Sequence, residues 1–188
     1  MRSFVIIGFI LALSVKSFAQ IQALEAEGNL ESPNPLGCVA IDSISNIYNP
    51  VDLYSGFTQC LEVNNYEVAV QLFVLAEAYG RFDILRVKDE TAHQALQVIQ
   101  IHAFSSLSQN QKDSLRVIME QEYEQGSQNL KNNCTKIREI GPPSYHPTYM
   151  IQHGLAAFTE NDEDGLVEVF ESKVAFEMVL VSFLQCEE

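Results

Sequence analysis

The sequence predicts an all-α fold, an antiparallel helical-hairpin domain of about five to seven helices stapled by disulfides. Three observations support this prediction. Apolar residues recur every three or four positions along most of the chain, which is the period of an amphipathic helix. Helix-capping residues stand before several of these apolar runs. Four cysteines, an even number, lie beyond the N-terminal segment.

The first 19 residues have the pattern of a secretory signal peptide. Arg2 provides the positive charge, residues 4–15 form an apolar core, and small residues at Ser17 and Ala19 precede the expected cleavage site. The alternative is an N-terminal membrane anchor, but Lys16 interrupts the apolar run before it reaches spanning length. We therefore expect residues 1–19 to be removed and the mature protein to be periplasmic or secreted, with no membrane insertion.

The segment that follows differs in composition from the rest of the mature chain. Residues 20–36 are polar and contain Pro33 and Pro35, which is typical of a flexible leader. The apolar periodicity begins after it. We therefore expect one helical domain over residues 37–188.

Start and stop signals divide the first half of this domain into helices. Asn49 and Pro50 form a cap and a first helical position, and Asn64 and Asn65 interrupt the run that follows. A second helix is predicted from Tyr66 to Tyr79, with Gly80 as its stop. A third is predicted from the cap at Asp89, and its buried stripe is Ala92, Leu96, Ile99 and Ala103.

The second half is predicted to contain two long helices. Ser108 and Gln111 form a capping box, and the apolar spacing continues past Gly126 to the stop at Gly141. We read this stretch as one long helix with a bend at Gly126. The last helix, over 172–186, is apolar nearly all round, so we expect it at the centre of the core.

The cysteines are predicted to form two disulfides, because an even number of cysteines in an exported chain usually pairs. The four residues are Cys38, Cys60, Cys134 and Cys186, and they allow three connectivities. We prefer Cys38–Cys60 and Cys134–Cys186, since the partners are near in sequence and each bridge ties a helix to a terminal segment. A structural zinc site is disfavoured because no CxxC occurs.

Residues 50–80 resemble a single helical hairpin of the tetratricopeptide or Sel1-like repeat families. The resemblance lies in the alternation of small and large residues at Tyr66, Ala69, Phe73 and Ala76. It implies a protein-binding scaffold rather than a catalyst. The alternative is that any helical hairpin needs small and aromatic residues where its helices cross, and one repeat cannot form a solenoid.

Residues 160–171 resemble an EF-hand calcium loop. The spacing D-x-D-x-D-G-x5-E is matched, with Glu in the first position, and Gly165 lies at the sharp turn. The resemblance implies calcium ligands at Glu160, Asp162, Asp164, the carbonyl of Leu166 and Glu171. The alternative is a solvated acidic loop that caps the final helix.

A Pro- and Tyr-rich connector at 142–152 is a candidate contact surface. Its prolines stiffen the backbone, and its aromatic and Met side chains suit protein contacts. The predicted partner-binding residues are Tyr145, His146, Tyr149 and Met150. The alternative is a rigid loop packed on its own core. His146 and His153 are also the candidates for a histidine-based active site.

Composition narrows the classes of partner. The chain has 11 Lys and Arg against 25 Asp and Glu, a formal net charge of −14. Loss of Arg2 and Lys16 with the signal leaves 9 basic and 25 acidic residues, a net charge of −16. An acidic surface disfavours nucleic acid and anionic membranes, because both attract clustered Lys and Arg. It favours a partner with a basic surface.

The predicted function is an exported, non-enzymatic protein-binding module with no resident cofactor. Motifs of common catalytic sites, including GxSxG, HExxH and phosphate-binding Gly-rich loops, do not occur in the sequence. A specific version is a periplasmic immunity or inhibitor protein that neutralises a toxin. The first alternative is a calcium-binding protein that uses residues 160–171, and the second is a histidine-based hydrolase.

Overall fold

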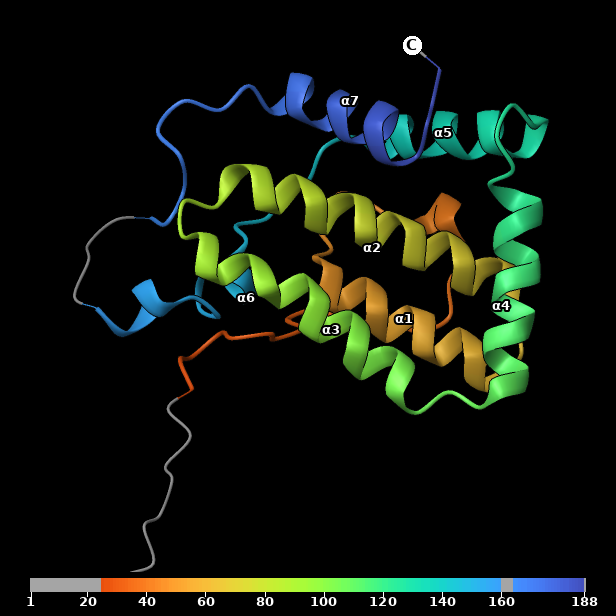
Figure 1. Ribbon diagram of the computed structural model, residues 1–188, viewed down its shortest axis with the longest axis horizontal. Coiled ribbons are helices and arrows are strands. Elements are labelled where there is room, and N and C mark those ends of the chain that lie inside the picture. The colour runs from red at the N-terminus through yellow and green to blue at the C-terminus, as the bar shows by residue number, and fades with distance from the viewer. Residues whose placement is uncertain (1–24, 160–163, 188) are drawn as a thin grey trace, which may run out of the picture.

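The computed structural model describes residues 25–159 and 164–187, and over these ranges it is all-helical, as predicted (Figure 1). They contain no β-strand and a single isolated β-bridge, between Val87 and Leu166. The predicted signal peptide, 1–19, lies outside the described residues. The α-helices are α1 (Pro50–Glu62), α2 (Tyr66–Arg86), α3 (Gln94–Ser105), α4 (Gln109–Glu122), α5 (Gln128–Ile140), α6 (Thr148–Ile151) and α7 (Ser172–Phe183). The 3-10 helices are η1 (Ile41–Ser43), η2 (Glu90–His93) and η3 (Leu155–Phe158).

Capping residues define the first hairpin, α1–α2. The Asn49 side chain accepts a hydrogen bond from Asp52 N at 2.9 Å, and the Asp52 carboxylate accepts one from Asn49 N at 3.0 Å. With Pro50 at the first helical position, this is the reciprocal capping box of an α-helix. Asn64 adopts a left-handed φ of 57°, and Asn65 caps α2. These local signals place the hairpin where the sequence predicts it.

The central helix is α2, and it is longer than predicted. The predicted stop at Gly80 is wrong, because the helix continues through Gly80 to Arg86. A Cβ atom at Gly80 would lie 2.3 Å from Leu96 Cδ1, so the glycine lets α3 pack close to α2. Other helices surround α2, which contacts α1, α3, α4 and α7. Its largest buried side chains are Leu72, Leu75, Tyr79 and Phe82.

The single long helix predicted from 108 to 141 is in fact two helices. The predicted capping box of Ser108 and Gln111 begins α4. A turn with Gly126 at a φ of 77° then separates the helices, and Ser127 caps α5. The prediction failed because the apolar spacing continues across the turn. Figure 1 shows α4 across one end of the α1–α2 hairpin, with α5 folded back beside α7.

The last helix, α7, lies at the periphery. Its predicted place at the centre of the core is wrong, because α2 occupies that position. One face of α7 packs on α2 and buries Ala175, Phe176, Val179 and Leu180. The opposite face is open: Val174, Met178 and Val181 are 67%, 50% and 36% exposed.

Both disulfides form in the preferred pairing. Cys38 is bonded to Cys60, and Cys134 is bonded to Cys186. The first bridge ties the segment before η1 to α1, and the second ties the chain after α7 to α5. Such bridges indicate an oxidising, extracellular compartment. Among the described residues, no helix combines the length and apolarity needed to cross a membrane.

Part of the expected flexible leader lies against the helices. The buried Asp52 carboxylate accepts hydrogen bonds from Ser32 Oγ at 2.6 Å and Asn34 N at 2.9 Å. Leu30 N donates to the carbonyl of Tyr149 at 3.1 Å. In this structure residues 30–34 are therefore attached to the helical body, whereas residues 20–24 lie outside the described ranges.

Candidate functional site

A buried charge cluster holds the Pro- and Tyr-rich connector, residues 142–152, against α2. Asp83 on α2 is fully buried and accepts hydrogen bonds from the hydroxyls of Tyr145 and Tyr149, both at 2.8 Å. Arg86 Nε donates to the same carboxylate at 2.8 Å, and its Nη2 donates to the Tyr145 carbonyl at 3.0 Å. Four hydrogen-bonding groups thus converge between α2 and the connector, which secures it to the core.

The protonation states in this cluster follow from burial. Burial, followed by the charge of Asp83, raises the pKa of Tyr145 and Tyr149 well above their usual range. Both tyrosines therefore remain protonated donors at neutral pH. Burial also raises the pKa of Asp83, while Arg86 and the two tyrosine hydroxyls oppose that change. The cluster is closed to solvent at Asp83, so its role is structural.

The predicted partner-binding residues divide between core and surface. Tyr149 and Met150 are buried, so the structure places them in the core and not on a contact surface. The Tyr145 side chain is half-buried and is held by Asp83. His146 alone of the four is exposed, and its ring contacts Thr148 Oγ1 and the carbonyl of Asp164. The connector therefore packs mainly on its own core.

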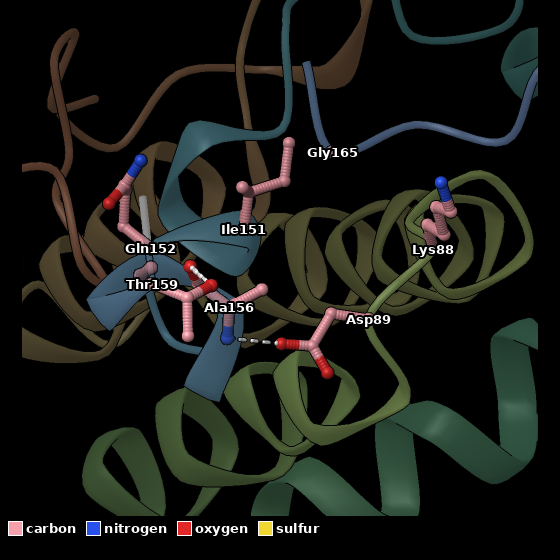
Figure 2. A pocket seen from close by; sticks show the side chains of 8 residues that line it. Lys88, Asp89, Ile151, Gln152, Ala156, Thr159 and Gly165 are labelled. Carbon is pink, nitrogen blue, oxygen red and sulfur yellow. Dashed lines mark hydrogen bonds between the residues drawn. The ribbon is translucent and has the colours of Figure 1, made fainter. Parts of the chain in front are cut away.

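A pocket lies where η3 approaches the start of η2 (Figure 2). It has a volume of about 460 Å³ and is lined by Lys88, Asp89, Ile151, Gln152, Ala156, Ala157, Thr159 and Gly165. Asp89 accepts a hydrogen bond from Ala156 N at 2.9 Å, which Figure 2 shows across the pocket. Its other oxygen accepts bonds from Thr91 N and Thr91 Oγ1.

Asp89 is an anchor for the backbone of η3. Burial raises its pKa, but the hydrogen bonds from Thr91 and Ala156 outweigh burial and lower the pKa below its ordinary value. Thr91 Oγ1 also accepts a hydrogen bond from Leu155 N at 2.9 Å. The Asp89 carboxylate therefore accepts three hydrogen bonds from protein donors, and these bonds join η2 to η3.

The described part of the predicted calcium loop is a tight turn. Gly165 has a φ of 77°, in keeping with the turn expected there, and Asp164 Oδ1 accepts a hydrogen bond from Leu166 N at 3.1 Å. Glu171 precedes α7 without a side-chain cap bond. Glu160 and Asp162 lie outside the described residues, so calcium binding stays a prediction. Within the described ranges, no three His, Cys, Asp or Glu side chains gather to hold a metal ion.

The two histidines of the predicted hydrolase site each have a structural contact. His146 bridges Thr148 and Asp164, as above, and His153 Nδ1 contacts Asn29 Oδ1 at 2.9 Å. These contacts join the connector to the acidic loop and to the N-terminal segment. The hydrolase hypothesis stays a prediction.

The open face of α7 is the remaining candidate. No other helix in the described ranges exposes three large apolar side chains: α3 exposes Val98 and Ile101, and η3 exposes Leu155 and Phe158. The sequence of α7 is apolar nearly all round, which predicts that both of its faces are buried in the core. In the structure only one face of α7 is covered, by α2 and its neighbours, and the sequence does not show this.

Covalent and ionic links hold α7 in place. Cys186, just beyond its end, is bonded to Cys134 on α5. Arg138 of α5 donates to the Glu177 carboxylate through Nε at 3.1 Å and to the Glu187 carbonyl through Nη2 at 2.7 Å. The hydrogen bonds from Arg138 lower the pKa of Glu177. The exposed apolar face is thus presented by a fixed helix.

The chain matches no protein-family model, no curated protein and no solved structure.

Proposed function

We propose that this protein is an exported protein-binding module that contacts its partner through the open face of α7. The observation that carries the proposal is the exposure of Val174, Met178 and Val181 on one face of a single helix. Scattered apolar residues are normal on a protein surface, but a contiguous apolar patch is typical of an interaction site. A helix face with this spacing is a recurring mode of protein recognition.

The way in which α7 is held supports the same proposal. A surface that is already ordered loses less conformational entropy when a partner binds. The Cys134–Cys186 disulfide and the Arg138–Glu177 ion pair both fix α7 on α5. The apolar face is therefore preorganised for binding.

Charge defines the kind of partner. A net charge of −14 favours a partner with a basic surface and speeds their encounter. The toxin-neutralising version of this proposal places a basic cleft of a toxin against α7. A deletion strain that resists toxins with a basic cleft as well as the parent strain does would contradict the toxin-neutralising version. The proposal that the protein binds a partner would still stand.

Site-specific photo-crosslinking tests the proposal. A crosslinking amino acid in place of Met178 should give one stoichiometric crosslinked species in the exporting cell. The same amino acid in place of Ile101, which is 59% exposed on α3, is the matched control and should give none. Val174→Asp with Val181→Asp should abolish the product. Absence of a product at Met178, or the same product at both positions, would contradict the proposal.

A further inference from the structure

The open face of α7 carries a shallow groove between two rows of side chains. Its lining residues are Lys173, Val174, Glu177, Met178, Val181 and Ser182. They fall into two rows with a spacing of four, one that starts at Lys173 and one that starts at Val174. Rows with this spacing are the ridges of an α-helix, and the groove between two ridges accepts a ridge of a second helix.

We propose, on the basis of the proposed function, that the occupant of this groove is an amphipathic helix of the partner protein, with Lys or Arg beside its apolar contact residues. The groove runs from residue 173 to residue 182, about 14 Å at the rise of an α-helix. That length matches two to three turns, enough for apolar side chains of a partner helix at positions i, i+4 and i+7. The apolar centre of the groove, Val174, Met178 and Val181, faces these side chains.

Acidic side chains near one end of the groove can form ion pairs with the basic residues of the partner helix. Glu168 and Glu171 are exposed immediately before α7. Glu177, within the groove, is already bound by Arg138, and Lys173 is the one cation among the lining residues named above. Lys173 lies at the same end of the groove as Glu168 and Glu171, and their two negative charges exceed its one positive charge, so basic side chains of the partner helix fit beside Glu168 and Glu171.

A second copy of this chain fits the groove less well. Self-association would bring together two chains that each carry a net charge of −14. A basic partner avoids the repulsion.

Binding of model helices to the full exported chain tests this inference. One probe is an amphipathic peptide with Leu on one face and Lys on the other, and the second has Glu in place of every Lys. We expect the Lys peptide to bind at least about tenfold more tightly, by fluorescence anisotropy, and its affinity to fall with salt. Val174→Ser with Met178→Ser should abolish this binding, whereas the matched control Ile101→Ser should not. Glu168→Lys with Glu171→Lys should remove the preference for the Lys peptide.

Each result decides between the inference and its alternatives. Equal binding of both peptides, or binding unchanged by Val174→Ser with Met178→Ser, would overturn the inference. A wild-type dimer that Val174→Ser with Met178→Ser converts to a monomer, in sedimentation, would assign the groove to a second copy and overturn it too. Failure of both peptides while the crosslink at Met178 persists would reject the helix inference and leave the proposed function standing. Failure of both peptides together with loss of the crosslink at Met178 would reject both the helix inference and the proposed function.

Discussion

At the scale of single residues, buried polar groups secure the irregular parts of this fold. Asp83 has no exposed surface, and its carboxylate is satisfied by Arg86, Tyr145 and Tyr149. A buried charge is tolerated only when such donors surround it. The consequence is a connector whose path over α2 is fixed even though it has little helix of its own.

A matched pair of tyrosine substitutions tests this role. Tyr149→Phe removes a hydrogen bond to a buried carboxylate and should lower the free energy of unfolding by about 1–3 kcal/mol. Tyr123→Phe should leave it unchanged or raise it, because the buried Tyr123 hydroxyl has no hydrogen-bond partner among the described residues. Urea unfolding measures both. Equal effects of the two substitutions would contradict a special role for Asp83.

Asp89 gives a prediction on pH. Its pKa in the folded protein lies below the ordinary value of 3.8, so its stabilisation is complete above that value and is lost as the pH falls through the folded-state pKa. Asp89→Asn cannot accept both sets of hydrogen bonds and should cost about 1 kcal/mol at neutral pH. The difference in unfolding free energy between wild type and Asp89→Asn should be constant well above pH 3.8 and should shrink as the pH falls below that value. A difference that does not change with pH would contradict the assignment.

Residue-scale features were predictable only where the partners are close in sequence. The capping boxes at Asn49 and Ser108 use a residue three positions away, so the sequence shows both partners together. The Asp83 cluster joins residues 62 and 66 positions apart, and periodicity carries no information on that pairing. The sequence therefore predicts Tyr149 as a contact residue, whereas the structure places it in the core.

At the scale of helices, the predictions failed at two glycines, Gly80 and Gly126. Gly80 is the instructive case, because glycine has two uses in helical proteins: it ends a helix, or it allows another helix to approach closely. Which use applies depends on Leu96, which is brought near by the fold. At Gly126 the prediction failed in the opposite way. Here the glycine does end the helix, but the apolar spacing continues across the turn and therefore predicts one long helix.

Gly80→Ala separates these two uses. Alanine favours a helix over glycine by about 1 kcal/mol, so a glycine without a packing role would be improved by the change. Here the new methyl group meets Leu96, and we expect a net loss of stability of about 1–2 kcal/mol in thermal or urea unfolding. Leu96→Val in the same chain should recover part of the loss. Stabilisation by Gly80→Ala alone would contradict the close packing of α2 and α3.

The error about α7 is also informative. Apolar residues on every face of a helix predict that each face is buried, but they do not show what covers each face. In this protein α2 covers one side and leaves Val174 and Met178 in solvent. The candidate site was therefore visible in the sequence as an excess of apolar residues, and the structure was needed to show that part of this excess is open.

At the scale of the whole molecule, two disulfides and a helical core define the fold class, and both were predictable. The pairing Cys134–Cys186 closes a sequence separation of 52, against 22 for Cys38–Cys60. Chain entropy predicts a larger contribution from the longer loop, about 4 kcal/mol against about 3 kcal/mol.

Paired cysteine-to-serine substitutions test whether the Cys134–Cys186 disulfide holds the open face of α7 in place. Cys134→Ser with Cys186→Ser should lower the free energy of unfolding by about 4 kcal/mol and increase hydrogen exchange in α7. Cys38→Ser with Cys60→Ser is the control: it should lower stability without selectively loosening α7. Unchanged exchange in α7 after loss of Cys134–Cys186 would show that the bridge does not hold the surface.

Oxidative footprinting of methionines tests the central claim, that α7 keeps one apolar face open for a partner. In the isolated protein, Met178, which is half exposed, should be oxidised readily, while Met150, which is buried, should be protected. In the exporting cell the partner should protect Met178 as well. Protection of Met178 in the isolated monomer, or full reactivity of Met178 in the cell, would contradict the account.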